Sequence, residues 1–307
     1  MKHALRRQPA QPQRIGALAI LALMSGWAYA ADIADVTSRD AWIASRDVQI
    51  PVTLVTPAGN GAQAMPLAVL IHGHGGTRHE AGGFTRIAEG LARHGIASVR
   101  MDFPGCGDST ESFANNNLTN MLADIKAGQA YALQELNIDP ARIGLLGFSM
   151  GGRLALSLAA ENNIYRAMGL WAPSARNGAD NMAKYLGGAD VYVQKRAQAK
   201  EQGWAPFTTF WGQDQQLGFQ WFTDLEKSTP RDDVVSFTGA LFVLYGDEDD
   251  VVTPDISAAV ARDAANASAV LVHVVRGADH GLGLFNDDWA RSEEAVTNTV
   301  TFFAEQL

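Results

Sequence analysis

One serine, set among glycines, constrains the fold of this chain more than any other feature. Ser149 lies in the segment Gly147-Phe148-Ser149-Met150-Gly151, after the apolar run Ile143–Leu146 and before the helix-prone stretch Gly152–Leu156. A strand, a sharp turn and a helix in this order hold a serine in a strained turn with its hydroxyl above the sheet. An ordinary glycine–serine loop is the alternative interpretation, so the serine needs partners before it indicates any chemistry.

A nucleophilic serine needs a histidine to take its proton and a carboxylate to orient that histidine. His280 lies in the segment Gly277–Gly281, directly after the β-branched run Val270–Val275. We therefore expect it in a loop at the end of a strand. If His280 were a lone histidine, the preferred interpretation would be a side chain that caps a backbone carbonyl. Its place after Ser149 in the chain instead favours the role of general base.

The acidic partner comes from a cluster of acids that follows the strand-like run Ala240–Leu244. We choose Asp249, which lies three residues after the glycine that ends the strand and three before Val252, where the chain can re-enter the core. Asp250 is the second candidate, because spacing alone does not separate neighbours in a turn. The three residues thus occur in the chain order Ser, Asp, His.

Acyl transfer also needs donors for the negative charge that develops on the substrate oxygen. A glycine-rich turn, His72-Gly73-His74-Gly75-Gly76, follows the apolar run Leu67–Val69 and can aim backbone N–H groups at such an oxygen. We expect the donors to be the N–H of His74 and the N–H of Met150, with Gly75 as the alternative to His74.

Metal, disulfide and thiol chemistry are not expected. His72 and His74 alternate along an extended segment, so their side chains point to opposite faces, and no third ligand lies nearby. Cys106 is the only cysteine, so no intramolecular disulfide can form. It follows the strand-like run Ser98–Asp102 and not the elbow, which favours a packed or pocket-lining thiol. No metal or organic cofactor is predicted.

Four segments in this order resemble the α/β-hydrolase family: His72–Gly76, Asp102–Ser109, the elbow around Ser149, and the loops of Asp249 and His280. The likeness spans roughly residues 40 to 307. The second segment, with the pattern D-x-x-G-x-G-x-S, is similar to bacterial feruloyl or cinnamoyl esterases and to serine aminopeptidase-like hydrolases. The resemblance implies a serine hydrolase with Ser149 as nucleophile, His280 as base and then acid, Asp249 as its partner, and His74 and Met150 as oxyanion donors.

Composition and patterning suit one large domain. The 307 residues are 47% hydrophobic and 19% charged, which is ample for a single core. Short apolar runs alternate with amphipathic stretches, which predicts an α/β fold with a mostly parallel sheet and helices on both faces. Expected strands are 67–71, 97–102, 143–147, 167–171, 240–245 and 269–275, with an entry hairpin of 48–55 and the segment near Trp42; expected helices are 84–93, 118–136, 150–160, 254–265 and 290–305.

The first thirty residues have the three parts of a secretory signal peptide. Three arginines, Arg6, Arg7 and Arg14, precede the apolar stretch Ile15–Met24, and Ala28-Tyr29-Ala30 follows it. The apolar stretch is too short to cross a bilayer, which argues against a membrane-spanning helix. We expect cleavage after Ala30 and a secreted or periplasmic protein of residues 31–307 without a membrane anchor. The arginine pair is interpreted as part of a general export signal.

The charge balance excludes some partners. The full chain has 24 basic and 33 acidic side chains, a net charge of −9, and cleavage would remove four basic groups and no acidic ones. The expected mature chain therefore carries about −13. Such an acidic surface disfavours nucleic acid and anionic lipid as partners. The partner that the predicted serine hydrolase implies is a small-molecule ester.

A long interval between two expected strands breaks the alternation. Residues from about 173 to 238 are more than one crossover helix needs, and long excursions of this kind are often lids or binding loops. We interpret them as a helical cap on the hydrolase domain. Its aromatic residues, most of which we expect in the cap's own small core, are Tyr185, Tyr192, Trp204, Phe207, Phe210, Trp211, Phe219, Trp221 and Phe222.

Sequence alone therefore predicts an exported serine hydrolase that cleaves carboxylic esters, with aromatic acyl groups of the feruloyl kind as one option. A peptidase of the same fold is the main alternative and would need an acidic anchor for a peptide amino terminus, for which Asp180, Asp190 and Glu201 are candidates. A non-catalytic binding protein would usually lack one of the three catalytic residues, and none is missing here.

Overall fold

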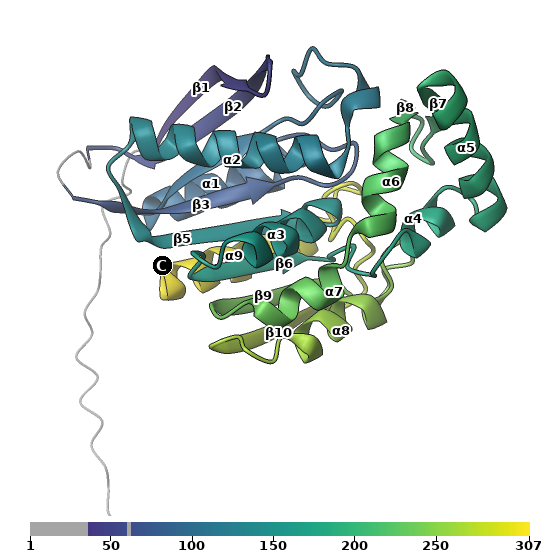
Figure 1. The fold of residues 1–307 in the computed structure, drawn as a ribbon. Helices are drawn as coiled ribbons and strands as arrows, with labels where there is room; N and C mark the ends of the chain where they lie inside the picture. Colours follow the sequence, from purple (N-terminus) through teal and green to yellow (C-terminus); the bar gives the residue numbers. More distant parts are fainter. Residues whose placement is uncertain (1–35, 60–62) are drawn as a thin grey trace, which may run out of the picture. The chain divides into compact units, whose positions relative to one another are not determined.

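Apolar runs build the centre of a long sheet. The computed structural model describes residues 36–59 and 63–307 (Figure 1), which lie within one compact unit, residues 33–307. Every residue of β3, β4, β6 and β9 is buried, as expected for strands covered on both faces. The strands are β1 (Val36–Ser45), β2 (Val48–Pro57), β3 (Met65–Ile71), β4 (Ala97–Met101), β5 (Ile138–Phe148), β6 (Ala167–Trp171), β7 (Trp204–Thr208), β8 (Asp214–Gly218), β9 (Ala240–Gly246) and β10 (Ala269–Val275).

Eight of these strands form one sheet in the order β1-β2-β4-β3-β5-β6-β9-β10. The hairpin β1–β2 is antiparallel, and β2 runs antiparallel to β4. From β4 to β10 every neighbouring pair is parallel. The carboxyl ends of these six strands therefore meet at one edge of the sheet, which is where open α/β sheets bind ligands.

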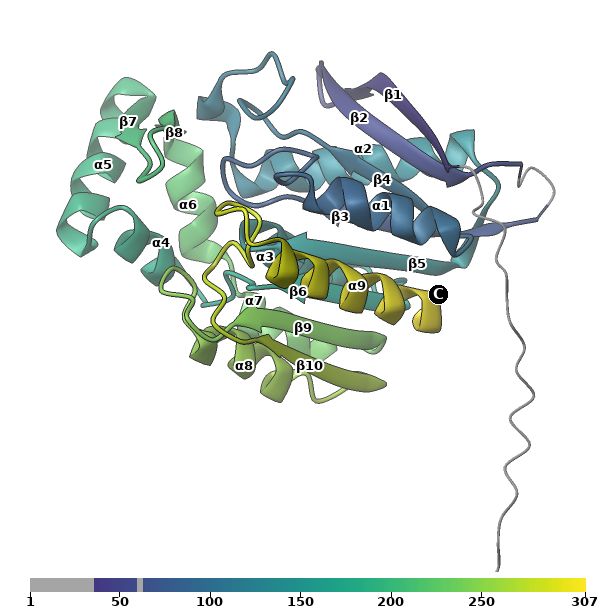
Figure 2. The same ribbon diagram turned by 180° about the vertical axis from the view of Figure 1, so that it is seen from behind.

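Helices cover both faces of this sheet (Figures 1 and 2). Helices α1 (Gly83–Arg93) and α9 (Trp289–Gln306) pack against each other on one face. Helices α2 (Leu118–Glu135), α3 (Met150–Glu161) and α8 (Pro254–Asp263) cover the other face. The structure confirms the predicted α/β fold class.

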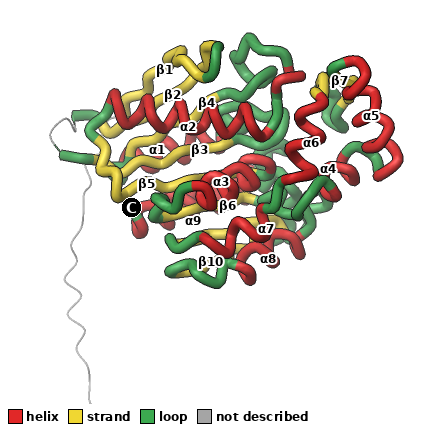
Figure 3. The backbone as a smooth tube through the Cα atoms, in the orientation of Figure 1, coloured by secondary structure: helices red, strands yellow, loops and turns green. Residues whose placement is uncertain are grey.

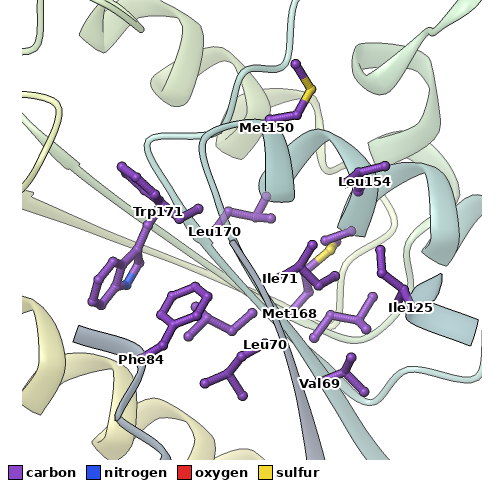
Figure 4. Close-up of a cluster of buried hydrophobic side chains, with 14 of the residues drawn as sticks. Val69, Leu70, Ile71, Phe84, Ile125, Met150, Leu154, Met168, Leu170 and Trp171 are labelled. Atoms are coloured by element: carbon purple, nitrogen blue, oxygen red, sulfur yellow. The ribbon is translucent and has the colours of Figure 1, made fainter. Parts of the chain in front are cut away.

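The core lies between these layers. Figure 4 shows Ile71 of β3, Leu170 of β6 and Leu154 of α3 packed in one apolar cluster. Trp171 is fully buried there, and its indole N–H donates to Thr299 Oγ1 of α9 at 2.8 Å. This bond gives the buried indole the partner that burial requires.

The segment between β6 and β9 forms the cap that was predicted as helical (Figure 3). It also contains a two-stranded antiparallel sheet of β7 and β8, which the sequence pattern does not predict. The cap elements are α4 (Asp180–Tyr185), α5 (Ala189–Gln202), β7, β8, α6 (Phe219–Lys227), α7 (Pro230–Asp233) and the short 3₁₀ helix η2 (Val234–Ser236). A second 3₁₀ helix, η1 (Phe113–Asn115), precedes the cap in the chain.

The predicted elements match the observed ones closely. The strands expected at 167–171 and 269–275 are β6 and β10 with the same bounds. The largest difference is β5, which begins at Ile138, five residues earlier than expected. The predicted signal peptide lies outside the described residues. Within residues 36–59 and 63–307, no helix combines the length and the apolar character that a bilayer crossing requires.

Candidate active site

The turn between β5 and α3 holds Ser149 in an unusual backbone conformation. Its φ is 53° and its ψ is −111°, and its N–H donates to Trp171 O at 2.8 Å. The turn is possible because glycines flank it. A Cβ on Gly147 would lie 2.3 Å from Gly151 O, and a Cβ on Gly151 would lie 2.0 Å from Ile71 O. The close packing of β3, β5 and α3 therefore forces the strained serine that the sequence pattern predicts.

The structure brings the three predicted catalytic side chains together. His280 Nε2 lies 3.0 Å from Ser149 Oγ, and His280 Nδ1 lies 2.8 Å from Asp249 Oδ2. Ser149, Asp249 and His280 follow the carboxyl ends of β5, β9 and β10, so the parallel sheet places them at one edge. Because Nδ1–H donates to the carboxylate, Nε2 is left as the acceptor that faces the serine hydroxyl.

Asp249 and its neighbour Asp250 have different environments. Asp249 is 3% exposed, and its Oδ1 accepts the N–H groups of Val251 at 2.9 Å and Val252 at 2.8 Å. Its Oδ2 is thereby aimed at His280. Asp250 is exposed on the cavity side and has no hydrogen bond to His280. The Asp249 side chain closes this turn through its bonds to the backbone, and this local hydrogen bonding distinguishes Asp249 from Asp250.

The predicted oxyanion donors also lie beside the serine. Met150 is the first residue of α3, where N–H groups have no partner within the helix, and the helix dipole favours negative charge. His74 follows β3, the neighbour of β5 in the sheet. Among the described residues, neither the Met150 N–H nor the His74 N–H is hydrogen-bonded to a protein acceptor. Both residues line the same cavity as Ser149.

The two histidines of the glycine-rich turn have separate partners, as their alternation predicts. His72 is buried against Phe103, whose N–H donates to His72 Nε2 at 3.2 Å. His74 points toward the cap, where its Nε2 lies 2.9 Å from Gln215 Oε1. Burial lowers the pKa of each histidine to about 4, so both are neutral near pH 7. Neither ring touches the serine hydroxyl.

A cavity of about 480 Å³ opens beside Ser149 and His280. Its walls come from the glycine-rich turn, the elbow, the cap and the loop that follows β10. Five aromatic rings line it, namely Phe148, Tyr185, Phe210, Trp211 and Phe285. The acidic residues Glu80, Asp250 and Asp279 also line it, whereas no lysine or arginine among the described residues does. The cavity is therefore suited to a largely apolar molecule without a negative charge.

The aromatic residues of the cap divide between two environments. Tyr185, Phe210 and Trp211 line the cavity, and Phe210 and Trp211 contact each other edge to face at 4.7 Å. Tyr192, Trp221 and Phe222 are buried inside the cap. Three of the nine aromatic residues of the cap therefore line the cavity, which is compatible with the expectation that most of the nine belong to the cap's own core.

Other candidates from the sequence lie elsewhere. Asp180, Asp190 and Glu201, considered as anchors for a peptide amino terminus, are exposed and do not line this cavity. Cys106 is buried, and burial raises the pKa of its thiol to about 12. The structure thus places none of these four residues against Ser149.

Two residues of this site are not predicted by any sequence pattern. Glu80 lies seven residues beyond Gly73 and accepts its N–H at 2.8 Å. Gln215 of β8 is hydrogen-bonded to His74, although the two residues are 141 positions apart in the chain. Neither residue belongs to a motif, and only the fold brings them to the turn.

Known proteins resemble this chain in sequence and in structure. A sequence model described as the alpha/beta hydrolase family matches residues 68–295. The quorum-quenching protein AidA of Acinetobacter baumannii is 35% identical over 120 residues, which cover 39% of this chain and 38% of that protein. Lipase 1 of a Moraxella species is 37% identical over 86 residues, which cover 27% of this chain and 25% of that protein. The chain thus spans well under half of the length of both relatives.

The structure of Est1E from Butyrivibrio proteoclasticus with bound ferulic acid superposes with a TM-score of 0.70 at 23% identity. The match covers 87% of this chain and 98% of that chain. At this level of identity the likeness shows a shared fold.

Proposed function

This chain belongs to the alpha/beta hydrolase family, and from that premise we propose that it is a serine hydrolase that cleaves carboxylic esters. The observation that best supports the proposal is that hydrogen bonds link Asp249 to His280 and His280 to Ser149 beside the aromatic cavity. A nucleophile, a base and an orienting acid within hydrogen-bond reach are the arrangement that acyl transfer requires.

The proposed reaction has two steps. Ser149 Oγ attacks the ester carbonyl while His280 Nε2 takes its proton, and the N–H groups of His74 and Met150 stabilise the negative oxygen. His280 then returns the proton to the leaving alcohol, which leaves an acyl group on Ser149. A water molecule, activated by the same histidine, attacks this acyl-enzyme and releases the acid. Asp249 keeps the imidazole in the required tautomer and stabilises its protonated form.

The cavity supports an ester with an uncharged, apolar or aromatic acyl group. In the described part of the chain, five phenylalanine, tyrosine or tryptophan rings offer faces and edges to an aromatic group, and no lysine or arginine lines the wall to pair with a carboxylate. The ferulic acid bound to Est1E, a protein of the same fold, supports the aromatic option. A short-chain aliphatic ester is the simpler alternative.

Peptidase activity is the second candidate. Asp250 and Asp279 line the cavity and are the acidic groups that a peptide amino terminus would meet. The residues first considered for this role lie outside the cavity, which weakens the peptidase proposal.

We also propose that residues 1–30 are an export signal and that the mature protein is a single hydrolase domain, residues 31–307, with the cap at about 173–238. The basic, apolar and small-residue regions of the first thirty residues support this proposal.

The proposal is tested with purified mature protein and its Ser149→Ala variant. We expect hydrolysis of methyl ferulate and p-nitrophenyl butyrate by the wild type, and a fall in kcat of about 10⁴-fold or more in the variant. Higher kcat/KM on methyl ferulate supports an aromatic acyl pocket, and higher kcat/KM on the butyrate supports a general carboxylesterase. Equal turnover by wild type and variant would contradict the proposed function.

A further inference from the structure

A buried carboxylate without a cation lies under the glycine-rich turn. Glu80 is 2% exposed, and within the described part of the chain it forms no ion pair with lysine, arginine or histidine. Among the described residues, the one hydrogen bond to its carboxyl group comes from the Gly73 N–H at 2.8 Å. Burial raises the pKa of its carboxyl group to about 7. An unpaired acid in such a place is costly, so its position calls for a physical reason.

The backbone around Glu80 is also unfavourable. Glu80 has a φ of 43° and Ala81 a φ of 48°, a left-handed conformation that residues with side chains rarely adopt. Hydrogen bonds hold this turn, from Glu80 N to Thr77 O and from Gly83 N to Glu80 O, both at 2.9 Å. The chain thus keeps a strained turn that directs the carboxyl group inward, and strain of this kind is typical of functional sites.

The carboxyl group of Glu80 contacts both ends of the turn that carries His74. The turn is closed by the Gly76 N–H, which donates to Gly73 O at 3.1 Å. A Cβ added to Gly76 would lie 2.9 Å from each carboxylate oxygen, so the carboxyl group also packs against this end. His74 lies between these two contacts, one residue beyond the N–H that Glu80 accepts.

We propose that Glu80 is a positioning residue of the oxyanion hole, because its carboxyl oxygen holds the Gly73 N–H and thereby fixes the direction of the His74 N–H. The inference rests on the proposed function, in which His74 is an oxyanion donor. The role requires an acceptor of this size and does not require charge, so an amide at position 80 serves equally well. Small displacements of a donor matter, since a shift of about 1 Å can lower the rate about 100-fold.

Two variants of matched size separate this role from simple packing. Glu80→Gln keeps the acceptor oxygen, whereas Glu80→Met fills the same space without one. We expect the Met variant to lose about 10- to 100-fold in kcat with KM changed less than about threefold, because the donor acts mainly on the transition state. The Gln variant should stay within about threefold of the wild type. Ala81→Gly, which relaxes the neighbouring residue, is the control and should retain wild-type kcat.

The affinity for phenylboronic acid is a second measurement of the oxyanion hole, because the tetrahedral adduct of this inhibitor with Ser149 places an oxygen there. Its affinity should fall in the Met variant by about the same factor as kcat. If circular dichroism shows that the Met variant is unfolded, Glu80→Ala, which also lacks an acceptor, replaces it and should show the same loss of kcat and of inhibitor affinity. Equal kcat and inhibitor affinity in the Gln variant and the folded acceptor-free variant would overturn the role of Glu80. Ester hydrolysis that persists in Ser149→Ala would instead overturn the proposed function.

Discussion

At the scale of single residues, neighbouring acids in one turn have different environments. Asp249 directs one oxygen to two backbone N–H groups and the other to His280, whereas Asp250 is exposed toward the cavity. A carboxylate with both oxygens held has little freedom to rotate away from the imidazole. The position of the backbone, more than the residue type, therefore selects the partner of His280.

Asp249→Asn should lower kcat by about 10³- to 10⁴-fold, because an amide that donates to Nδ1 favours the wrong imidazole tautomer. Asp250→Asn, the neighbouring control, should lose less than about tenfold. Steady-state hydrolysis of p-nitrophenyl butyrate measures both variants. A larger loss in the Asp250 variant than in the Asp249 variant would reassign the triad acid to Asp250.

The buried acid under the turn makes stability depend on pH. The pKa of Glu80 rises from an ordinary value of 4.5 to about 7 on folding. The folded state therefore holds this proton more tightly, and the stability it contributes below pH 4.5 is lost as the pH rises to 7. The difference is on the order of 3 kcal/mol in the free energy of unfolding, by linkage.

Glu80→Gln removes this titration. Between pH 5 and pH 8 the wild type should lose stability relative to the Gln variant, as measured by urea unfolding at each pH. The comparison between variants is needed because His72 and His74, whose pKa values are lowered to about 4, act in the opposite direction below pH 6.5. A constant difference between the two proteins across this range would contradict a raised pKa for Glu80.

At the scale of elements, the cap hairpin contacts the glycine-rich turn directly. Gln215 of β8 is 3% exposed, and its amide donates to Gln213 Oε1 at 3.0 Å. This bond orients the Gln215 oxygen toward His74 Nε2. The hairpin therefore holds the ring of the residue whose N–H we propose as an oxyanion donor, which connects the cap to the catalytic edge of the sheet.

Gln215→Leu should lower both stability and turnover. The variant leaves the buried His74 Nε2–H without an acceptor, which costs about 1–3 kcal/mol. The loss would be measured as a lower midpoint of urea unfolding together with a lower kcat. Gln216→Leu, on the exposed face of the same strand, is the matched control. It should lower the unfolding midpoint and kcat less than Gln215→Leu does. Equal effects of the two substitutions would argue against a specific role for Gln215.

At the scale of the whole molecule, we expect the charge distribution to disfavour anionic substrates. The chain has a net charge of −9, and three acidic residues but no lysine or arginine of the described part of the chain line the cavity. A substrate with a free carboxylate would be repelled on approach and would lose its hydration without gaining an ion pair.

Dimethyl terephthalate and monomethyl terephthalate test this selection, because they share one ring and differ by one negative charge. We expect kcat/KM to be at least about tenfold lower for the monomethyl ester, a penalty of about 1.4 kcal/mol or more. Added salt should reduce the difference by screening the charges outside the cavity. A similar kcat/KM for the two esters would contradict the electrostatic argument.

Much of the fold could be predicted because its strands are short apolar runs that alternate with helices. The bounds of β6 and β10 match those predicted from the sequence, since each strand is a continuous apolar or β-branched run. The sequence pattern of β10 nevertheless suggests full burial, whereas Val270 and Val272 are 41% and 49% exposed at the edge of the sheet. The hairpin β7–β8 was missed because Asp214-Gln215-Gln216 has no hydrophobic alternation.

Local chemistry in the sequence determined which residues could be reactive. Gly147, Gly151 and the strand before Ser149 are local requirements of the elbow, and His280 and Asp249 follow recognisable strands, so all three side chains were predicted from the sequence. Only the tertiary structure decided that His280 lies 3.0 Å from Ser149, and that Glu80 and Gln215 hold the turn of His74 from two sides. The physical reason is that hydrogen bonds and packing depend on distance in space, and parallel strands bring together residues that lie far apart along the chain.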